Sequence, residues 1–417
     1  MTLDDWLEYI LHCPSIDRSH SHVQMVAERL DVLLFSCPVV LVGGTNGKGS
    51  CACFLESIYQ AAGYRTGCYT SPHLRRVNER IKFNDTMISD KALVSCLSMV
   101  EGARSGLSLT FFEYMTLAAL IYFKRVEPDV MILEVGIGGR LDTVNAVRAD
   151  VAVITSVGMD HTDVLGDSRE AIGFEKAGLY KPGVVAICGD KDAPQSILKV
   201  EGKEREGLCL INRDFKVLSN VDYFDYLGLH LRWDDLPMPA LRLDNAAVSL
   251  AVVEALLSKL PVSLAIIGRG LGAASLPGRF QRVDAPVPVI CDVAHNVDAV
   301  RYLAQQLRVN SFDGMTVAVV GFMQNKDIRG MLLEMMEEIN IWCAVSLSVF
   351  RGVSADQIVQ NMQTEVAKNC YTFSSVAAAM QDVCSSSFSA ASGKPYRVVV
   401  FGSFHTVAQA QAYLQVL

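Results

Sequence analysis

The chain has 417 residues, of which 51% are hydrophobic and 20% charged, and 45 acidic against 37 basic residues give a net charge of −8. This length suits about two or three domains, and the apolar content excludes a disordered or fibrous protein. The charges are scattered, and no apolar run approaches the roughly 18 residues of a membrane-spanning helix. General nucleic-acid binding and membrane insertion are therefore disfavoured.

The cysteines and the first residues both bear on the compartment. Twelve cysteines are spread along the chain without a CxxC pair, which is typical of reduced thiols in a cytoplasmic protein. The closest pair, Cys51 and Cys53, is interpreted as helix packing rather than a metal site. Asp4 and Asp5 stand where a signal peptide would carry positive charge. We therefore expect a cytoplasmic protein rather than an exported one.

From residue 39 onward, short β-branched runs alternate with helical patterns, which predicts a parallel α/β sheet covered on both faces. Strands are predicted over 39–42, 66–69, 130–133, 151–154 and 184–187. Helices are predicted over 49–62, 91–103, 111–125 and 169–177. Residues 208–243 alternate aromatic and polar side chains and predict a small antiparallel appendage, and a helix is expected over 245–257.

The run Leu276-Pro-Gly-Arg-Phe280 punctuates the chain as a turn, and we place the domain boundary there, giving domains 1–279 and 280–417. Strands are predicted beyond it over 287–291, 316–320, 342–347 and 396–401. Helices are predicted over 299–307, 330–338, 355–363 and 375–383. The expected fold class is α/β, with a P-loop-type doubly wound, mostly parallel sheet domain and its appendage, then a smaller Rossmann-like α/β domain.

The strongest motif is an apolar strand that leads into a glycine-rich turn and a helix, Val39-Val-Leu-Val-Gly-Gly-Thr-Asn-Gly-Lys-Gly-Ser50. Glycines let backbone N–H groups converge on phosphate oxygens, the helix N-terminus adds partial positive charge, and Lys48 supplies a full charge. The match to the common P-loop pattern is imperfect, because Val42 replaces its first glycine and Gly49 separates Lys48 from Ser50. Taken alone, the loop also fits a tight strand-to-helix turn without a ligand.

The departure from the common pattern is informative, because Gly44-Thr-Asn-Gly-Lys-Gly-Ser50 resembles the phosphate loop of the Mur ligase superfamily. Within it, the chain resembles the folylpolyglutamate synthase family, in the bacterial form that also acts as dihydrofolate synthase. The resemblance covers nearly the whole chain. Its further motifs, in order, are Thr70-Ser-Pro-His-Leu74, Phe112-Glu-Tyr114, Leu133-Glu-Val-Gly-Ile-Gly-Gly-Arg-Leu-Asp142, Asp160-His161, Glu175-Lys-Ala-Gly178, Leu276-Pro-Gly-Arg-Phe280, Asp292-Val-Ala-His-Asn296, Lys326-Asp327 and Gly402-Ser-Phe-His405.

The resemblance implies an ATP site and two Mg²⁺ ions. ATP would be bound by the phosphate loop and by residues toward the adenine, a phosphate and the ribose: Thr45, Asn46, Gly47, Lys48, Gly49 and Ser50, with Asn245, Arg279 and Asp292. The metal ligands implied are Ser50, Ser71, Glu134 and His161. Taken singly, each residue also has a structural explanation. Glu134 fits a ligand site or a helix cap, Asn245 fits a helix N-cap, and Arg279 fits a solvated charge in a turn. Oxygen ligands suit Mg²⁺ better than His161 does.

The residues implied to act in catalysis are Lys48, His161, Lys176, Arg279 and His295. By composition, Lys176 is a lysine placed favourably near a helix C-terminus. The resemblance implies that it is carbamylated and supports the second metal, and it leaves open whether a monovalent cation is needed.

Substrate residues are implied at both ends of the reaction. The pterin end comprises Ile16, Asp17, Arg18, Thr110, Phe112, Leu141, Asp142 and Thr143, and the incoming glutamate would face His295, Ser403 and His405. An aromatic ring with a carboxylate suits a flat, hydrogen-bonding pterin, although Phe112 fits the core equally and each histidine fits a structural role equally. Residues 18–22 read Arg-Ser-His-Ser-His where the family usually has Leu-Gly-Leu-Glu-Arg, so the pterin loop departs from the pattern.

The resemblance thus implies a monomeric, ATP-dependent ligase that adds L-glutamate to dihydropteroate and to tetrahydrofolate through an acyl phosphate. A single one of these two activities is one alternative. A cell-wall Mur ligase is another, but that enzyme normally carries an additional N-terminal domain, and only 38 residues precede the first predicted strand. A nucleotide-operated switch would not need the combined set Glu134, His161, Lys176, Arg279 and Asp292.

Overall fold

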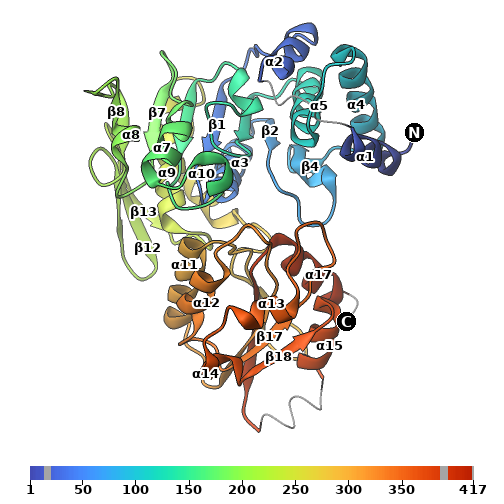
Figure 1. Ribbon diagram of the computed structural model, residues 1–417. Helices are drawn as coiled ribbons and strands as arrows, with labels where there is room; N and C mark the ends of the chain where they lie inside the picture. Colours follow the sequence, from blue (N-terminus) through green and yellow to red (C-terminus); the bar gives the residue numbers. More distant parts are fainter. Residues whose placement is uncertain (14–19, 386–392, 416–417) are drawn as a thin grey trace. The chain divides into compact units, whose positions relative to one another are not determined.

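A computed structural model describes residues 1–13, 20–385 and 393–415 of the chain (Figure 1). The fold divides into two compact units. The first consists of Met1–Gly158 with Val164–Ser275, and the second of Met159–Asp163 with Leu276–Leu417. The division after Ser275 lies close to the expected boundary, and the short segment 159–163 groups with the second unit although its neighbours in sequence do not.

The first unit is built on an eight-stranded sheet in the order β10-β7-β6-β1-β5-β2-β3-β4. The strands from β10 to β2 pair in parallel, and β3 and β4 add an antiparallel edge. The predicted parallel sheet is confirmed. Its strands are β1 (Val39–Gly43), β2 (Thr66–Tyr69), β3 (Ile81–Phe83), β4 (Thr86–Met87), β5 (Val130–Glu134), β6 (Val151–Ile154), β7 (Val185–Cys188) and β10 (Leu208–Leu210).

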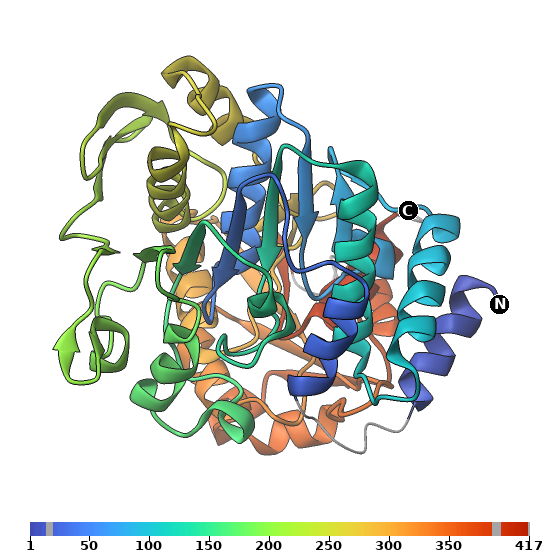
Figure 2. The ribbon, with the colours of Figure 1, turned by 90° about the horizontal axis from the view of Figure 1, so that it is seen from above.

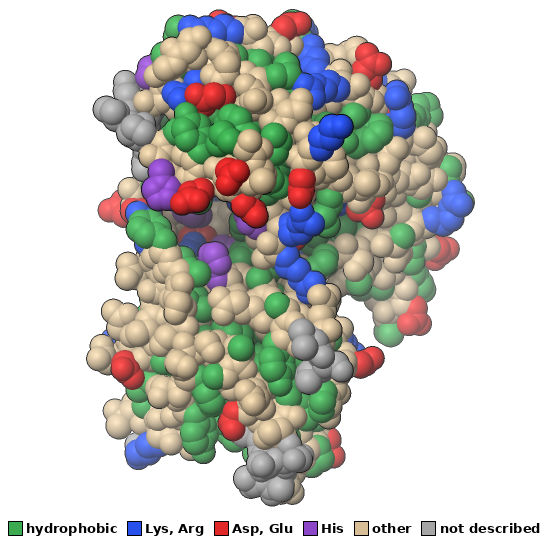
Figure 3. Space-filling view, turned by 90° about the vertical axis from the view of Figure 1, so that its right-hand side faces the viewer, with side chains coloured by type: hydrophobic (Ala, Val, Ile, Leu, Met, Phe, Trp, Pro, Cys, Tyr) green, Lys and Arg blue, Asp and Glu red, His purple; other side chains and the backbone are tan. Residues whose placement is uncertain are grey.

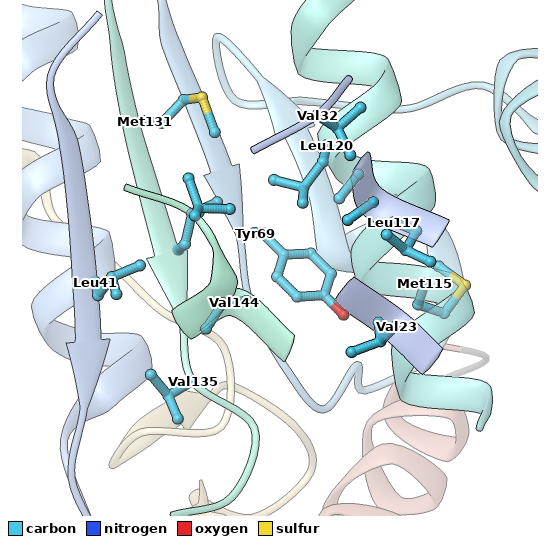
Figure 4. Packing of buried hydrophobic residues seen from close by; sticks show 14 of the residues in the cluster. Val23, Val32, Leu41, Tyr69, Met115, Leu117, Leu120, Met131, Val135 and Val144 are labelled. Atoms are coloured by element: carbon cyan, nitrogen blue, oxygen red, sulfur yellow. The ribbon is translucent and has the colours of Figure 1, made fainter. Parts of the chain in front are cut away.

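Helices cover both faces of this sheet, as its continuous apolar strands require (Figure 2). On one face lie α4 (Asp90–Arg104) and α5 (Phe111–Val126), and on the other α3 (Lys48–Ala61), α9 (Leu243–Leu256) and α10 (Leu264–Ala273). Figure 4 shows Tyr69 in the core on the α5 side, with Leu41 and Met131 of the sheet to one side of its ring and Leu117 and Leu120 of α5 to the other.

The remaining elements of the first unit are short or peripheral. They are α1 (Leu3–His12), α2 (His20–Arg29), η1 (Val77–Arg80), η2 (Thr143–Ala146), α7 (Arg169–Ala177), α8 (Gln195–Leu198), β8 (Lys199–Val200) and β9 (Lys203–Glu204). The short helix α6 (Thr162–Leu165) has residues in both units. None of the helices within the described ranges combines the length and apolar character needed to span a bilayer.

An antiparallel appendage is present, and it is smaller than predicted. It consists of β11 (Lys216–Ser219), β12 (Tyr223–Leu227) and β13 (Arg232–Pro237), in which the rings of Tyr226 and Trp233 stack with centroids 5.2 Å apart. The prediction that residue 208 begins this appendage is wrong, because β10 pairs in parallel with β7 and extends the main sheet.

The second unit has a six-stranded sheet in the order β14-β15-β19-β16-β17-β18, parallel except for β14. Its buried aromatic rings Phe322, Trp342 and Phe401 pack edge to face in the core. The predicted second α/β domain is confirmed. Its elements are β14 (Gln281–Val283), β15 (Val289–Cys291), α11 (Val297–Val309), β16 (Met315–Val320), α12 (Ile328–Met335), β17 (Ile341–Val345), α13 (Ala355–Gln360), α14 (Thr364–Ala367), β18 (Cys370–Phe373), α15 (Val376–Val383), β19 (Tyr396–Phe401) and α17 (Phe404–Leu414).

Candidate active site

The glycine-rich loop joins β1 to α3 at the carboxyl end of the first sheet, where parallel α/β sheets bind ligands. The Lys48 ammonium bends back over the loop and donates to the carbonyl oxygens of Gly44 at 3.0 Å and Thr45 at 3.3 Å. Helix α3 begins at Lys48, after Gly47, so its first amides have no capping side chain from that residue. A helix N-terminus of this kind, with a lysine beside it, suits an anionic phosphate.

Two glycines of the loop adopt backbone angles that favour glycine. Gly44 has φ of 134° and Gly47 has φ of 91°. A Cβ on Gly47 would lie 2.4 Å from Oδ1 of Asn245, so the structure brings Asn245 of α9 directly against the loop. Asn245 is buried, as is Ser50 in the first turn of α3. The first unit therefore brings together Thr45 to Ser50 and Asn245, the residues of this unit that are expected to bind a nucleotide.

Two hydroxyl residues after β6 fix the loop, and neither belongs to the motifs found in the sequence. Thr155 donates from Oγ1 to the Asn46 carbonyl oxygen at 2.7 Å, and Ser156 Oγ accepts from the Asn46 amide at 3.0 Å. The amide of Thr45 donates to the Ser156 carbonyl at 2.8 Å. The signal was available, because both hydroxyl residues directly follow an apolar strand whose place in the sheet is beside β1.

Ser71 and Glu134 lie together at the ends of neighbouring strands β2 and β5. The Ser71 amide donates to Glu134 Oε2 at 3.0 Å, and the Glu134 side chain is buried. A hydroxyl and a carboxylate at one strand edge are oxygen donors of the kind that Mg²⁺ prefers, usually together with waters and substrate phosphates. Among the described residues no group of three or more His, Cys, Asp or Glu side chains is arranged to hold a metal, so any ion would depend on such additional ligands.

The loop after β5 is organised by Asp142. Its Oδ2 accepts from the amides of Gly136 and Ile137, both at 3.0 Å, and its Oδ1 accepts from Val144 at 3.0 Å. Burial raises the pKa of Asp142 to about 6, and the three amide hydrogen bonds oppose that rise. The carboxylate predicted to contact the pterin is thus engaged with its own loop.

The other residues predicted for the pterin end take different positions around this loop. The ring of Phe112 lies 2.5 Å from where a Cβ on Gly136 would be, so it packs on the same turn that Asp142 holds. Thr110 is the N-cap of α5 and forms a capping box with Glu113. Leu141 is 55% exposed and Thr143 is buried. Ile16, Asp17 and Arg18 lie outside the described residues.

Lys176 is buried in the last turn of α7, with 3% of its surface exposed. The loop after β5 lies against that turn, because a Cβ on Gly139 would be 2.9 Å from the carbonyl oxygens of Glu175 and Lys176. The amide of Arg140 donates to the same Glu175 carbonyl at 2.7 Å. The turn that carries Lys176 is therefore packed against the glycine loop that follows Glu134.

In the second unit, Asp292 follows β15 and is hydrogen-bonded to the turn after residue 278. Its Oδ2 accepts from the Phe280 amide at 2.7 Å and its Oδ1 from Ala294 at 2.8 Å. Burial raises the pKa of Asp292, and the nearby charge of Arg279 opposes the rise. The Arg279 guanidinium stacks over the ring of Phe404, 5.3 Å from its centroid.

His295 also packs against Phe404, with the centroids of the two rings 5.7 Å apart. Its Nδ1 is 2.8 Å from the carbonyl oxygen of Val293, which can only accept, so Nδ1 carries the proton of the neutral ring. Burial, reinforced by the charge of Lys326, lowers the pKa of His295 to about 4. The imidazole is therefore neutral near pH 7.

The remaining predicted residues of the second unit are placed differently. Ser403 is the N-cap of α17, and its Oγ accepts from the Thr406 amide at 3.1 Å and pairs with Thr406 Oγ1 at 2.7 Å. His405 is exposed in the first turn of the same helix. His161 lies in the segment 159–163 with a positive φ of 52°. Its neighbour Asp160 is paired with Lys326.

Comparison with known proteins decides the family. The Mur ligase middle domain matches residues 42–208, and the Mur ligase glutamate ligase domain matches residues 278–404. A dihydrofolate synthase/folylpolyglutamate synthase of Escherichia coli is 41% identical over 97% of this chain and 94% of its own length. The chain belongs to the dihydrofolate synthase/folylpolyglutamate synthase family.

Other members of the family agree. The Haemophilus influenzae dihydrofolate synthase/folylpolyglutamate synthase is 36% identical over 99% of this chain and 98% of its own length. A structure of E. coli FolC with DHPP and ADP superimposes with a TM-score of 0.93 at 39% identity, covering 100% of this chain and 98% of that one. A bifunctional folylpolyglutamate synthase/dihydrofolate synthase with Mn, AMPPNP and L-glutamate bound gives 0.91 at 41% identity, with the same coverage. The predicted family and the two-domain ligase fold are confirmed.

Proposed function

We propose that this chain uses ATP to join L-glutamate to the carboxylate of dihydropteroate and of tetrahydrofolate. The observation that carries the proposal is the Lys48 loop at the start of α3, with Asn245 against it, in a chain whose relatives at up to 41% identity carry both names. A carboxylate oxygen of the folate substrate attacks the γ-phosphorus, the bond to the β-phosphate oxygen breaks, and ADP leaves. The glutamate amine then attacks the acyl carbon, loses a proton, and inorganic phosphate departs.

The chain's own residues would position and neutralise these anions. Lys48 and the first amides of α3 would bind phosphate oxygens. Arg279 is the further cation that the family resemblance assigns to a phosphate. Ser50, Ser71 and Glu134 of the first unit would hold magnesium, as the family resemblance implies, and a carbamylated Lys176 would support the second ion. The metal when bound neutralises charge on the transferring phosphoryl group. The neutral His295 is suited to accept a hydrogen bond at Nε2.

Several finer points belong to the same proposal. All twelve cysteines are free thiols, which supports a cytoplasmic location. Figure 3 shows acidic and basic side chains interspersed over the visible face rather than gathered into a basic field, which supports small-molecule rather than nucleic-acid partners. We also propose that the protein is a monomer. A monovalent cation is a candidate activator, which is tested by adding it to the assay.

A paired assay tests the activity. ADP release is measured with ATP, Mg²⁺ and glutamate in the presence of dihydropteroate, of tetrahydrofolate, or of neither, and the products are weighed by mass spectrometry. We expect ADP release with each folate and a mass gain of one glutamyl unit per ADP. ADP release with only one of the two folates restricts the enzyme to that activity. If neither folate supports ADP release, the proposal is contradicted.

Lys48→Ala tests the phosphate loop within that assay. Because no other group of the loop supplies a full positive charge, we expect turnover to be abolished while the fold stays intact by circular dichroism. Lys259→Ala is the matched control, since Lys259 forms an exposed ion pair with Asp150 in the same unit. Near-normal glutamate-dependent ADP release from Lys48→Ala would defeat the assignment of this loop.

A further inference from the structure

Two charged side chains that lie outside the motifs found in the sequence, Arg169 and Asp190, hold the backbone of Val157 from both sides. Asp190 Oδ2 accepts from the Val157 amide at 2.6 Å, and Arg169 Nε donates to the Val157 carbonyl oxygen at 2.9 Å. The two side chains also bind each other, with Arg169 Nη2 3.1 Å from Asp190 Oδ1. Val157 is buried, so these side chains supply the partners that its peptide groups need.

The place of Val157 in the first unit connects this pair with the phosphate loop. In the sheet, β6 lies between β7 and β1, so the segments that follow these three strands are neighbours at its carboxyl edge. Asp190 follows β7, residues 155–158 follow β6, and the phosphate loop follows β1. The segment 155–158 therefore stands between the Arg169–Asp190 pair and the loop.

The residues on either side of Val157 bind Thr45 and Asn46 of the phosphate loop. Ser156 accepts from the Asn46 amide through its hydroxyl and from the Thr45 amide through its carbonyl. The Gly158 amide donates to Thr45 Oγ1 at 2.9 Å, and that hydroxyl donates to the Gly158 carbonyl oxygen at 3.2 Å. A displacement of Val157 would thus move both of its neighbours and, with them, the phosphate loop.

Arg169 also connects this support with α7. It is the first residue of that helix, whose last turn carries the buried Lys176. Its guanidinium donates to Asp192 as well, to Oδ2 at 2.7 Å and to the carbonyl oxygen at 2.6 Å. A planar fork with five donors can serve Val157, Asp190 and Asp192 at once, whereas the compact ammonium of a lysine cannot reproduce that geometry.

Stability alone is a weak explanation for these contacts. The Arg169 side chain is 37% exposed and that of Asp192 is 92% exposed, and exposed ion pairs contribute little to folding. The Asp190 side chain, in contrast, is 9% exposed and directs one oxygen at a backbone amide. Hydrogen bonds to both peptide groups of one residue, next to the residues that hold a ligand loop, are better explained by the position that they fix.

We propose that Arg169 and Asp190 are positioning residues of the ATP site, which act on the phosphate loop through the segment 155–158. This inference rests on the part of the proposed function in which that loop binds ATP. Neither side chain has to touch the nucleotide. A loop that is already held in its binding conformation has less to order when the ligand arrives, so its loss of support should weaken nucleotide binding and leave the binding of L-glutamate unchanged.

Asp190→Asn and Asp192→Asn test the proposal as a matched pair, because each removes one negative charge beside Arg169 and only Asp190 contacts Val157. In an acidic protein, the loss of a negative charge by itself favours an anionic ligand. We nevertheless expect Asp190→Asn to raise the Kd for Mg²⁺-AMPPNP and the KM for ATP about tenfold or more, and the KM for L-glutamate less than about twofold. Asp192→Asn should leave all three constants within about twofold of wild type.

The expected sign follows from the hydrogen bonds. An asparagine has a single acceptor oxygen, so its amide group would face either the Val157 amide or the Arg169 guanidinium, both of which donate to Asp190. Arg169→Lys keeps the charge and loses the fork, and we expect it to weaken Mg²⁺-AMPPNP binding in the same direction.

A double-mutant cycle shows whether the effect passes through the segment 155–158. Ser156→Ala removes the hydroxyl that this segment directs at Asn46. If Asp190 acts through the segment, then Asp190→Asn should raise the Kd for Mg²⁺-AMPPNP much less in the Ser156→Ala background than in the wild type.

Three results would overturn the role of the pair: an unchanged or lower Kd in Asp190→Asn, equal weakening in Asp190→Asn and Asp192→Asn, or full additivity with Ser156→Ala. Equal rises in the KM for ATP and for L-glutamate would likewise reduce it to general support of the fold. Failure of the proposed function is recognised separately, because AMPPNP binding involves no chemical step. A wild-type protein that binds Mg²⁺-AMPPNP but releases no ADP with either folate contradicts the proposed reaction and leaves this test valid, whereas one that does not bind it contradicts both.

Discussion

Several side chains predicted to contact substrate are engaged by the chain's own backbone. Asp142 holds three amides of the loop after β5, Thr110 caps α5 and Ser403 caps α17. Each shapes a loop or a helix start at the carboxyl end of a sheet, so its influence on a substrate would pass through the backbone that it fixes. Lys48, Arg279 and His405 are instead side chains with a charged or titratable end.

The buried His295 predicts how the stability of the protein depends on pH. Its pKa is lowered to about 4 in the folded protein, against about 6.5 in an unfolded chain, so the unfolded state binds more protons between these values. Stability should therefore be fully present above about pH 6.5 and be lost as the pH falls toward 4. The loss attributable to this residue is about 3 kcal/mol, since each unit is worth about 1.4 kcal/mol.

The measurement compares the wild-type protein with His295→Gln, which keeps a donor for the Val293 carbonyl. Urea unfolding is followed at pH 7, 5.5 and 4 by the fluorescence of Trp342, the tryptophan of the second unit, in a Trp6→Phe, Trp233→Phe background. The wild-type protein should lose more stability on acidification than the variant. Parallel loss in both would show that His295 does not titrate in this way.

At the scale of elements, the phosphate loop depends on a backbone conformation that residues other than glycine rarely adopt. Gly47 has φ of 91° and abuts Asn245, whereas Gly63 has a similar φ of 86° with nothing near its missing Cβ. Either glycine replaced by alanine should cost about 1–2 kcal/mol of stability, because the left-handed conformation is strained. Gly47→Ala should in addition raise the KM for ATP, while Gly63→Ala should not.

Thermal melting and steady-state kinetics on these two variants separate strain from site damage. Gly47→Ala should lower the melting temperature more than Gly63→Ala, because its Cβ would also lie 2.4 Å from Asn245 Oδ1, and the KM for ATP should differ between the two variants by at least about tenfold. An unchanged KM for ATP in Gly47→Ala would mean that the approach of Asn245 to the loop has no part in nucleotide binding.

Elements with a strong periodic pattern could be predicted from sequence, and those defined by their partners could not. Strands β1, β5 and β6 are apolar up to their carboxyl ends because both faces of the sheet are covered. The helix α10 was not predicted, since it contains Gly268, Gly270 and Gly272, which lower helix propensity. One of them serves packing, because a Cβ on Gly270 would lie 2.5 Å from the Cα of Ile58 in α3. No pattern local to residues 264–273 carries that information.

Edge strands and side-chain partners were missed for related reasons. The edge strand β18 is half-exposed and short, and β10 reads as part of the polar appendage although its partner is β7. The site motifs were found because they are contiguous, such as the phosphate loop. The contact of Asp160 with Lys326 joins residues far apart in sequence, and only the fold brings them together.

For the whole molecule, a net charge of −8 must be reconciled with substrates that are all anions. Long-range attraction would not bring ATP, folate or glutamate to such a chain, so affinity has to come from local cations and oriented amides. Lys48 with the start of α3 provides these in the first unit, and Arg279 and Lys326 are the cations near the strand ends of the second. Magnesium adds positive charge that the protein itself lacks.

The change in stability on nucleotide binding tests whether local positive centres provide the affinity, and it needs no chemical step. A ligand that binds only the native state at about 100 times its Kd adds about 2.7 kcal/mol, which for units of this size is about 5–10 °C in melting temperature. We expect Mg²⁺ with AMPPNP to produce such a shift, EDTA to remove most of it, and Lys48→Ala to reduce it, while the exposed Lys259→Ala retains it. The metal is needed because the nucleotide's four negative charges meet an acidic protein. A full shift with EDTA present, or an equal shift in Lys48→Ala, would show that nucleotide affinity does not depend on these local positive centres.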